Sequence, residues 1–146
     1  MKELRTAIEI NAPADTVWAI LTDLGQFAAW NPFIPEAEGE IREGARLKVR
    51  IAPPGGKAMT FKPTVTRVEP GRAFRWLGHL LLPGLFDGEH IYEISPLAEG
   101  GVRFVQREEF RGVLAPLLWK SLETNTRQGF EAMNAALKKL AEEEHG

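Results

Sequence analysis

Apolar and polar positions alternate at the start of the chain. Between residues 4 and 10 every second position is apolar or threonine, the pattern of a strand with one buried face. After Pro13 the apolar residues follow one face of a helix as far as Gly25, and a second helical turn covers residues 26–30. Asn31-Pro32 ends that turn, because a residue before proline disfavours helical dihedrals. The pattern therefore predicts a strand followed by two short helices.

The middle of the chain is divided by turn-forming glycine and proline residues. The intervening runs have the length of strands and the spacing of hairpins. They cover residues 34–42, 46–52, 59–68, 73–80, 89–95 and 102–111. Together with the first strand, they predict a curved, seven-stranded antiparallel sheet.

The last segment has the apolar spacing of a long helix from Pro116 to Glu142. Such a helix reaches about 40 Å at 1.5 Å per residue, enough to cross a small domain. We expect it to lie across the sheet in a single α+β domain spanning residues 1–146. A curved sheet need not close tightly on one helix, so the arrangement predicts an internal apolar cavity between them.

Composition narrows the classes of function. With 44% hydrophobic residues the chain can bury a core, and without cysteine it has neither disulfides nor thiolate metal sites,. A net charge of −2 from intermixed acids and bases indicates no nucleic-acid partner. The sequence has neither a signal-peptide pattern nor an apolar run long enough for stable membrane insertion. We expect a cytoplasmic protein with a small-molecule ligand, without a metal or other cofactor.

Four segments carry a resemblance to a known superfamily. They are residues 14–18, 30–33, 84–90 and 126–134. The chain resembles the SRPBCC (START/Bet v 1-like) superfamily, and most of all its polyketide cyclase/dehydrase branch. The resemblance spans essentially the whole chain and implies the helix-grip fold. It also implies binding of lipids, sterols, polyketides or plant hormones, or activity as a cyclase or cofactor-free lyase. No catalytic motif is common to the whole group.

One face of the later strands is rich in aromatic side chains with few polar groups, the mixture found in ligand pockets. An ordinary core uses the same aromatics, and both interpretations stay open. The predicted ligand-binding residues are Trp30, Phe33, Phe61, Phe74, Trp76, His90, Tyr92, Phe104, Gln106, Phe110, Phe130 and Met133.

His90 and Glu108 are the candidates for catalysis. If the turn after the penultimate strand places Ile94 opposite Phe104, the same register places His90 opposite Glu108. The carboxylate could raise the histidine pKa, and the pair could transfer protons during aldol closure or dehydration. Alternatively, the pair is a polar contact that orders the hairpin or anchors a ligand carbonyl.

Three further features allow two or more interpretations. Gly129 interrupts the long helix either for close packing on the sheet or to leave room for a ligand. The apolar segment Leu80 to Phe86 is a gate to the cavity, a transient contact with a membrane or protein, or part of the core. The Tyr92 hydroxyl either orients a ligand or makes a hydrogen bond in the core, and we favour the core bond. We expect His79 at the surface.

These observations support three hypotheses. The first is a binder or carrier of a hydrophobic small molecule of lipid, polyketide or aromatic type. The second is a cofactor-free polyketide cyclase or dehydratase that uses His90 and Glu108. The third is a protein-interaction module, which requires the segment from Leu80 to Phe86 to be exposed and the cavity to be filled.

Overall fold

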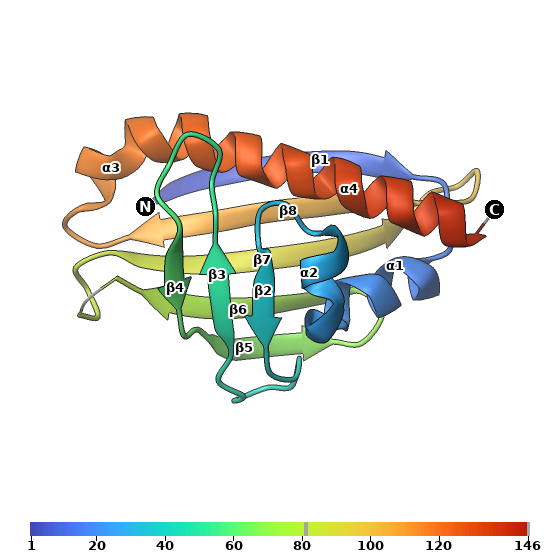
Figure 1. Cartoon of the computed structure of the whole chain (residues 1–146), viewed down its shortest axis with the longest axis horizontal. Helices are drawn as coiled ribbons and strands as arrows, with labels where there is room; N and C mark the ends of the chain where they lie inside the picture. Colours follow the sequence, from blue (N-terminus) through green and yellow to red (C-terminus); the bar gives the residue numbers. More distant parts are fainter. Residues whose placement is uncertain (81, 146) are drawn as a thin grey trace.

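The computed structural model describes residues 1–80 and 82–145. Its larger sheet is antiparallel and has five strands (Figure 1). In spatial order they are β1 (Lys2–Ile10), β8 (Val102–Arg111), β7 (Asp87–Pro96), β6 (Ala73–His79) and β5 (Thr64–Glu69). A long helical segment lies along the β1 side of this sheet. The predicted α+β class and helix-grip arrangement are confirmed.

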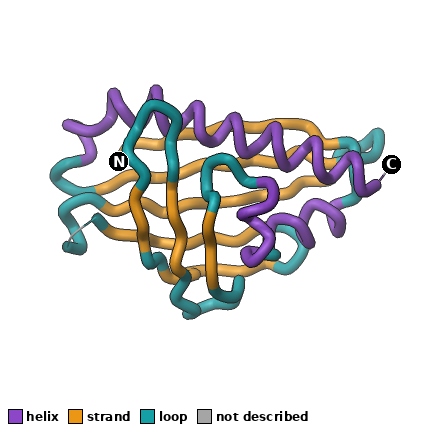
Figure 2. The backbone as a smooth tube through the Cα atoms, in the orientation of Figure 1, coloured by secondary structure: helices purple, strands orange, loops and turns teal. Residues whose placement is uncertain are grey.

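A second, smaller sheet lies in front of the first in Figure 1, and its strands run across those behind it. It contains β2 (Glu36–Glu38), β3 (Lys48–Ile51) and β4 (Met59–Phe61) in that order. An isolated bridge pairs Arg46, just before β3, with Thr64 at the start of β5, the edge strand of the larger sheet. The tube in Figure 2 shows the chain passing from the larger sheet to the smaller one through short helices and returning after β4 through a short loop.

The predicted count of seven strands is wrong, because residues 59–68 form two strands. β4 ends at Phe61 and β5 begins at Thr64, in the other sheet. Lys62 and Pro63 lie between them. Proline lacks the N–H that a sheet ladder requires and restricts the residue before it, so the chain turns there. The described residues form eight strands in all.

Two short helices follow the first strand, as predicted. They are α1 (Ala14–Thr22) and α2 (Phe27–Trp30), connected by the 3₁₀ turn η1 (Leu24–Gln26). Asn31 ends α2 and directs the chain toward β2, since its Oδ1 accepts hydrogen bonds from the backbone N–H groups of Phe33 and Ile34 at 3.0 and 2.8 Å.

The C-terminal helical segment is not one regular α-helix. It consists of α3 (Ala115–Ser121), a π-helical turn η2 (Leu122–Thr126) and α4 (Arg127–His145). The Arg127 N–H donates to the Leu122 carbonyl, five residues earlier. The Thr124 hydroxyl donates to the Lys120 carbonyl at 3.0 Å, a back-bond that often bends helices. The apolar periodicity alone did not reveal this turn.

The inner face of α4 completes the core. Its side chains at intervals of three or four are fully buried, namely Phe130, Met133, Leu137 and Ala141. Gly129 lies so close to the Phe33 ring that a Cβ atom there would overlap it. Close packing therefore explains this glycine without a ligand. None of the helices in the described ranges is long and apolar enough to cross a membrane.

Candidate functional site

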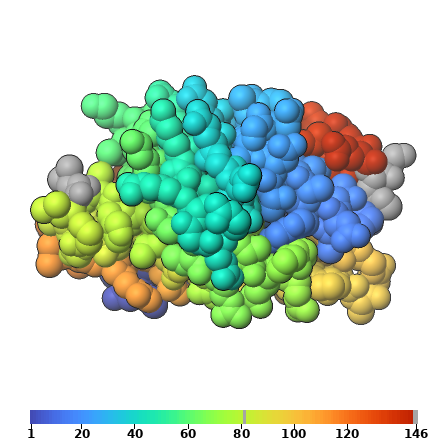
Figure 3. All heavy atoms as spheres, turned by 90° about the horizontal axis from the view of Figure 1, so that it is seen from below, coloured from blue at the N-terminus to red at the C-terminus, as the bar shows by residue number. Residues whose placement is uncertain are grey.

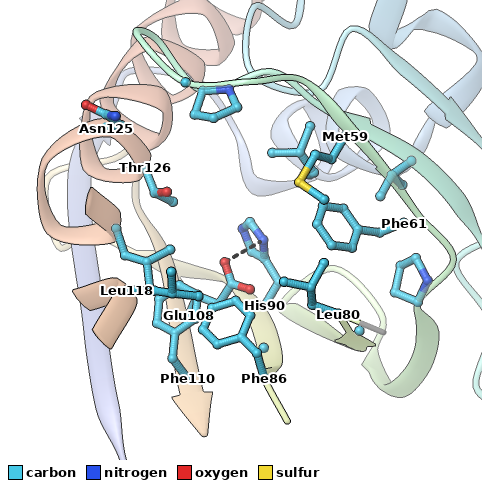
Figure 4. A pocket seen from close by; sticks show the side chains of 18 of the residues that line it. Met59, Phe61, Leu80, Phe86, His90, Glu108, Phe110, Leu118, Asn125 and Thr126 are labelled. Atoms are coloured by element: carbon cyan, nitrogen blue, oxygen red, sulfur yellow. Dashed lines mark ion pairs between the residues drawn. The ribbon is translucent and has the colours of Figure 1, made fainter. Parts of the chain in front are cut away.

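A cavity of about 340 Å³ opens between the two sheets at the α3 end of the molecule (Figure 4). This volume is within the range of small-molecule sites. Most of the wall is apolar. The lining residues are Phe33, Val49, Ile51, Pro53, Gly56, Lys57, Met59, Phe61, Pro63, Trp76, Gly78, His79, Leu80, Phe86, Gly88, His90, Glu108, Phe110, Leu118, Ser121, Leu122, Asn125 and Thr126.

The π-helical turn and the β3–β4 hairpin meet over the cavity. Gly55, at the tip of the hairpin, lies beside the Asn125 side chain, with 3.7 Å between a Cβ built on the glycine and the amide oxygen. Figure 4 shows Asn125 and Thr126 on the side opposite Met59 and Phe61. The π turn therefore brings polar side chains to the wall that faces the smaller sheet.

His90 and Glu108 come from neighbouring strands and lie together in the cavity wall. The predicted register of β7 and β8 is confirmed, with Ile94 opposite Phe104 and His90 opposite Glu108. His90 Nδ1 is 3.6 Å from Glu108 Oε1, near enough for electrostatic contact but too far for a direct hydrogen bond. The His90 side chain is 2% exposed, whereas Glu108 keeps 18% of its side chain accessible.

Burial keeps both members of the pair uncharged near neutral pH. Desolvation lowers the pKa of His90 to about 3, opposed by its hydrogen bond to Gln106. Desolvation also raises the pKa of Glu108 to about 8. The expectation that the carboxylate raises the histidine pKa is wrong, because the carboxyl group is itself protonated at pH 7 and burial disfavours the imidazolium.

Behind His90, a chain of hydrogen bonds runs into the core. His90 Nε2 is 2.9 Å from Gln106 Oε1, and Gln106 Nε2 donates to Asn134 Oδ1 at 2.8 Å. Asn134 Nδ2 donates to the Thr6 hydroxyl at 2.9 Å, and this hydroxyl donates to the Gln106 backbone carbonyl at 2.9 Å. All four side chains are buried, and they come from β7, β8, α4 and β1.

The predicted site residues divide between the cavity wall and the adjacent core. Phe33, Phe61, Trp76, His90, Glu108 and Phe110 line the cavity. Phe74, Tyr92, Phe104, Gln106, Phe130 and Met133 are buried in the core instead, outside the lining set. Trp30 packs on Phe27 with ring centroids 5.3 Å apart and is also absent from the lining. Sheet alternation identifies a face but not the point along the strands where the cavity ends.

Tyr92 is buried without the core hydrogen bond that we favoured. Its ring stacks on the His90 imidazole, with centroids 4.4 Å apart and an interplanar angle of 17°. Its hydroxyl has no hydrogen-bond partner among the described residues. Desolvation and, secondarily, the nearby Glu108 charge raise the tyrosine pKa well above its usual value. The ring packs well, but the hydroxyl is left unpaired.

The segment from Leu80 to Phe86 forms part of the cavity rim. Leu80 and Phe86 line the cavity, and Phe86 stacks on Phe110 with centroids 5.6 Å apart. Leu82 is 69% exposed, and Leu81 is outside the described residues. The predicted contact of this segment with a membrane or protein stays a prediction. His79, which is partly exposed as expected, also lies at the rim and pairs with Asp87 at 2.7 Å.

This rim segment is fixed to the start of α3. The Val113 and Leu114 N–H groups donate to the carbonyls of Gly84 and Leu85, at 3.3 and 3.0 Å. In Figure 3 the yellow-green and orange atoms of these two segments gather at the same end of the molecule. Exposed Leu82, Val113 and Leu117 thus belong to the end at which the cavity lies.

Sequence reasoning missed the lining residues of β3, its hairpin and the π turn. The strand alternation of Val49 and Ile51 could have identified two of them, but we followed only the later strands. Thr126 lies in the same helical period as Phe130 and Met133 and could have been identified too, whereas Asn125 lies outside that period and gave no signal. Among the described residues, no group of three or more histidine, cysteine, aspartate or glutamate side chains could hold a metal ion.

Comparison with known families identifies the chain over nearly its full length. The family described as "Polyketide cyclase / dehydrase and lipid transport" matches residues 1–142. The chain belongs to this family. A comparison with curated proteins gave no match. Membership in the polyketide cyclase/dehydrase and lipid transport family agrees with the resemblance of the sequence to the SRPBCC superfamily.

Solved structures show how widely this family's fold is shared. The Zhui aromatase/cyclase from Streptomyces sp. R1128 is 18% identical, with a TM-score of 0.78, coverage of 97% of this chain and 93% of that one. A Thermus thermophilus protein is 19% identical, with a TM-score of 0.76 and coverage of 99% and 100%. A norcoclaurine synthase variant from Thalictrum flavum is 16% identical, with a TM-score of 0.75 and coverage of 99% and 96%. At these identities the likeness shows the fold alone.

Proposed function

We propose that this protein binds a hydrophobic, ring-containing small molecule in the cavity between its two sheets. The supporting observation is the cavity itself, with a volume of about 340 Å³ and a largely apolar wall in which uncharged His90 and Glu108 lie together. Aromatic walls such as Trp76 and Phe61 favour flat apolar ligands, while the buried pair can exchange hydrogen bonds with one ligand oxygen.

Binding can be tested with the neutral fluorescent probe N-phenyl-1-naphthylamine. We expect saturable binding at one site per chain. Thr126→Trp should lower the affinity at least about tenfold, the equivalent of losing contact with roughly two methylene groups, because Thr126 faces the cavity (Figure 4). Glu123→Trp is the matched control, since Glu123 lies in the same π turn but is exposed and outside the lining. Equal affinities for the two variants would contradict binding in this cavity.

A second candidate function is proton transfer on the bound ligand, favoured by the Glu108 carboxyl, which holds its proton at pH 7, at 3.6 Å from Nδ1 of the neutral His90 ring. For a β-hydroxy ketone, Glu108 gives its proton to the hydroxyl oxygen, which leaves as water. His90 Nδ1 takes the proton from the carbon next to the carbonyl, and the carbon–carbon double bond forms. The new carboxylate stabilises the imidazolium 3.6 Å away,. Return of the proton from His90 to Glu108 restores the starting state.

This reaction can be tested with 3-hydroxy-1-tetralone, whose dehydration and enolisation give fluorescent 1-naphthol. We expect turnover by the unaltered protein and its loss in His90→Gln and Glu108→Gln. Binding of the naphthylamine probe to the variants should weaken only modestly, because most of the wall is unchanged. Turnover that survives both substitutions would contradict the proton-transfer role and leave binding as the function.

A further inference from the structure

The hydrogen-bond chain behind His90 has a direction that can be read from its far end. The Gln106 backbone carbonyl can only accept, so the Thr6 hydroxyl must donate its single proton there,. Thr6 Oγ1 is then an acceptor for the Asn134 amide N–H. Asn134 Oδ1 must in turn accept from the Gln106 amide nitrogen, which leaves Gln106 Oε1 facing His90.

The same direction determines where the His90 ring carries its proton. Gln106 Oε1 is an acceptor, so the His90 Nε2 atom at 2.9 Å must be protonated. Because burial keeps the ring neutral at pH 7, it has only one N–H, and Nδ1 keeps its lone pair. This lone pair is on the Glu108 side of the ring, in the wall of the cavity.

We propose that Thr6 and Asn134, neither of which lines the cavity, are positioning residues that hold His90 as the Nε2–H tautomer, with the Nδ1 lone pair available to the ligand and Glu108. The role in chemistry rests on the proposed proton transfer, whereas the tautomer is a property of the protein without any ligand.

The opposite tautomer of His90 requires the whole chain of hydrogen bonds to reverse its direction. With the proton on Nδ1, two acceptors would meet at Nε2 and Gln106 Oε1 unless the Gln106 amide turned over. The turned amide would require Asn134 to turn as well, and the Thr6 hydroxyl would then have to donate to Asn134. The Gln106 carbonyl would lose its hydrogen bond from Thr6, so the reversed arrangement has one buried hydrogen bond fewer and is less stable. Thr6 on β1 thus determines which ring nitrogen of His90 carries the proton, although His90 lies two strands away on β7.

Three elements hold this chain in place independently of the cavity. Thr6 and Gln106 are direct partners in the β1–β8 ladder, and Asn134 reaches them from α4. All three side chains are buried, with exposed fractions of 7%, 0% and 2%. The ring formed by the Gln106 side chain, Asn134, Thr6 and the Gln106 carbonyl therefore orients the glutamine amide before any ligand binds.

Nitrogen NMR of histidine-labelled full-length protein at pH 7 tests the proposal, because long-range proton–nitrogen correlations show which ring nitrogen is protonated. His90→Gln assigns the signal among the three histidines. We expect the Nε2–H pattern in the unaltered protein. Thr6→Val keeps the side-chain shape but removes the hydroxyl that sets the direction of the hydrogen-bond chain. The two directions of this chain then have nearly equal free energies. It should therefore increase the Nδ1–H fraction about tenfold, the effect of one ordinary hydrogen bond.

Thr6→Ser is the control, because it restores the hydroxyl and should restore the tautomer. Asn134→Leu, a second route to the same effect, should also release the preference. An Nδ1–H pattern in the unaltered protein, or unchanged tautomers in folded Thr6→Val and Asn134→Leu, would overturn the proposal. Turnover of 3-hydroxy-1-tetralone by Thr6→Val should show a lower kcat with little change in KM, since Thr6 does not line the cavity.

Failure of the proposed function would be visible separately. If N-phenyl-1-naphthylamine does not bind while His90 shows the expected tautomer and response to Thr6→Val, the binding function is overturned and the assignment of Thr6 and Asn134 as tautomer-setting residues stands. If the probe binds but the tautomer differs, the positioning proposal fails and the binding function stands.

Discussion

At the scale of single residues, a glycine sets the position of the Glu108 carboxyl. A Cβ atom at Gly88 would overlap Glu108 Oε2 and lie 3.3 Å from its Cδ. The absence of a side chain at this position lets the carboxyl lie beside His90 rather than farther into the cavity. The backbone of β7 thus shapes the site through a residue that has no chemistry of its own.

Gly88→Ala should therefore lower turnover strongly while changing the stability of the fold only a little. The added methyl meets the end of a flexible side chain, so we expect the carboxyl to move away at a cost of about 1 kcal/mol in the free energy of unfolding, the lower end of the range for overpacking. Turnover of 3-hydroxy-1-tetralone should fall at least tenfold. Gly78→Ala is the control, because Gly78 pairs with Gly88 across the strands and its Cβ would make an ordinary 3.7 Å contact with Pro63. Equal turnover by the two variants would show that the Glu108 position does not matter.

The two buried titratable groups make opposite contributions to the pH dependence of stability. Folded Glu108 holds its proton up to about pH 8, compared with 4.5 for an ordinary glutamate, so its contribution to stability is lost as pH rises between these values. Folded His90 stays neutral down to about pH 3, compared with 6.5, so its contribution is lost as pH falls through that window. The two effects offset each other between pH 4.5 and 6.5.

Glu108→Gln should remove the loss of stability on the alkaline side. We expect the free energy of unfolding of the variant, relative to the unaltered protein, to rise from pH 5 to pH 8 by at most about 1.4 kcal/mol per pH unit. Urea unfolding at a series of pH values measures this difference. A difference that does not change with pH would mean that the Glu108 pKa is not raised in the folded protein.

At the scale of elements, the contact between α4 and the segment before β2 explains a glycine that is costly in a helix. Gly129→Ala should gain about 1 kcal/mol of helix propensity but force the buried Phe33 ring to move. We expect a net destabilisation of about 1–3 kcal/mol from overpacking, measured by urea unfolding. Gly25→Ala, where the nearest atom is 4.0 Å away, should change stability little. If Gly129→Ala were more stable than the unaltered protein, the Phe33 ring would be shown to move aside at little cost.

Strands and helices with a strong alternation of apolar and polar residues could be predicted from the sequence. Interruptions of these elements that leave little trace in that alternation could not. The alternation in β7 and β8, with a short turn between them, was enough to place His90 opposite Glu108. The break between β4 and β5 at Lys62 and Pro63 was also predictable, because proline rarely continues a strand ladder. The prediction of one strand over residues 59–68 did not take this proline into account. The π turn at residues 122–126 depends on backbone hydrogen bonds that apolar spacing does not report.

At the scale of the whole molecule, the position of the cavity depends on how the two sheets cross. The sequence predicted a space between a helix and one curved sheet. Instead, β3 and β4 form one wall, β6 to β8 form another, and α3 with the π turn closes the end. Predicted residues away from the α3 end, such as Phe104 on β8 and Met133 on α4, are therefore part of the core. Local patterns do not specify where packed layers diverge, so most of the cavity lining could not be predicted from them.

The most direct test of the central claim is an amide proton–nitrogen NMR titration of the full chain with N-phenyl-1-naphthylamine. We predict saturable shifts at cavity residues such as Gly78, Gly88 and Asn125, and none at Glu38 and Thr60, which line a separate hollow of about 40 Å³ on the smaller sheet. The absence of saturable shifts, or shifts centred on that hollow, would contradict the account of the cavity as a binding site for hydrophobic small molecules.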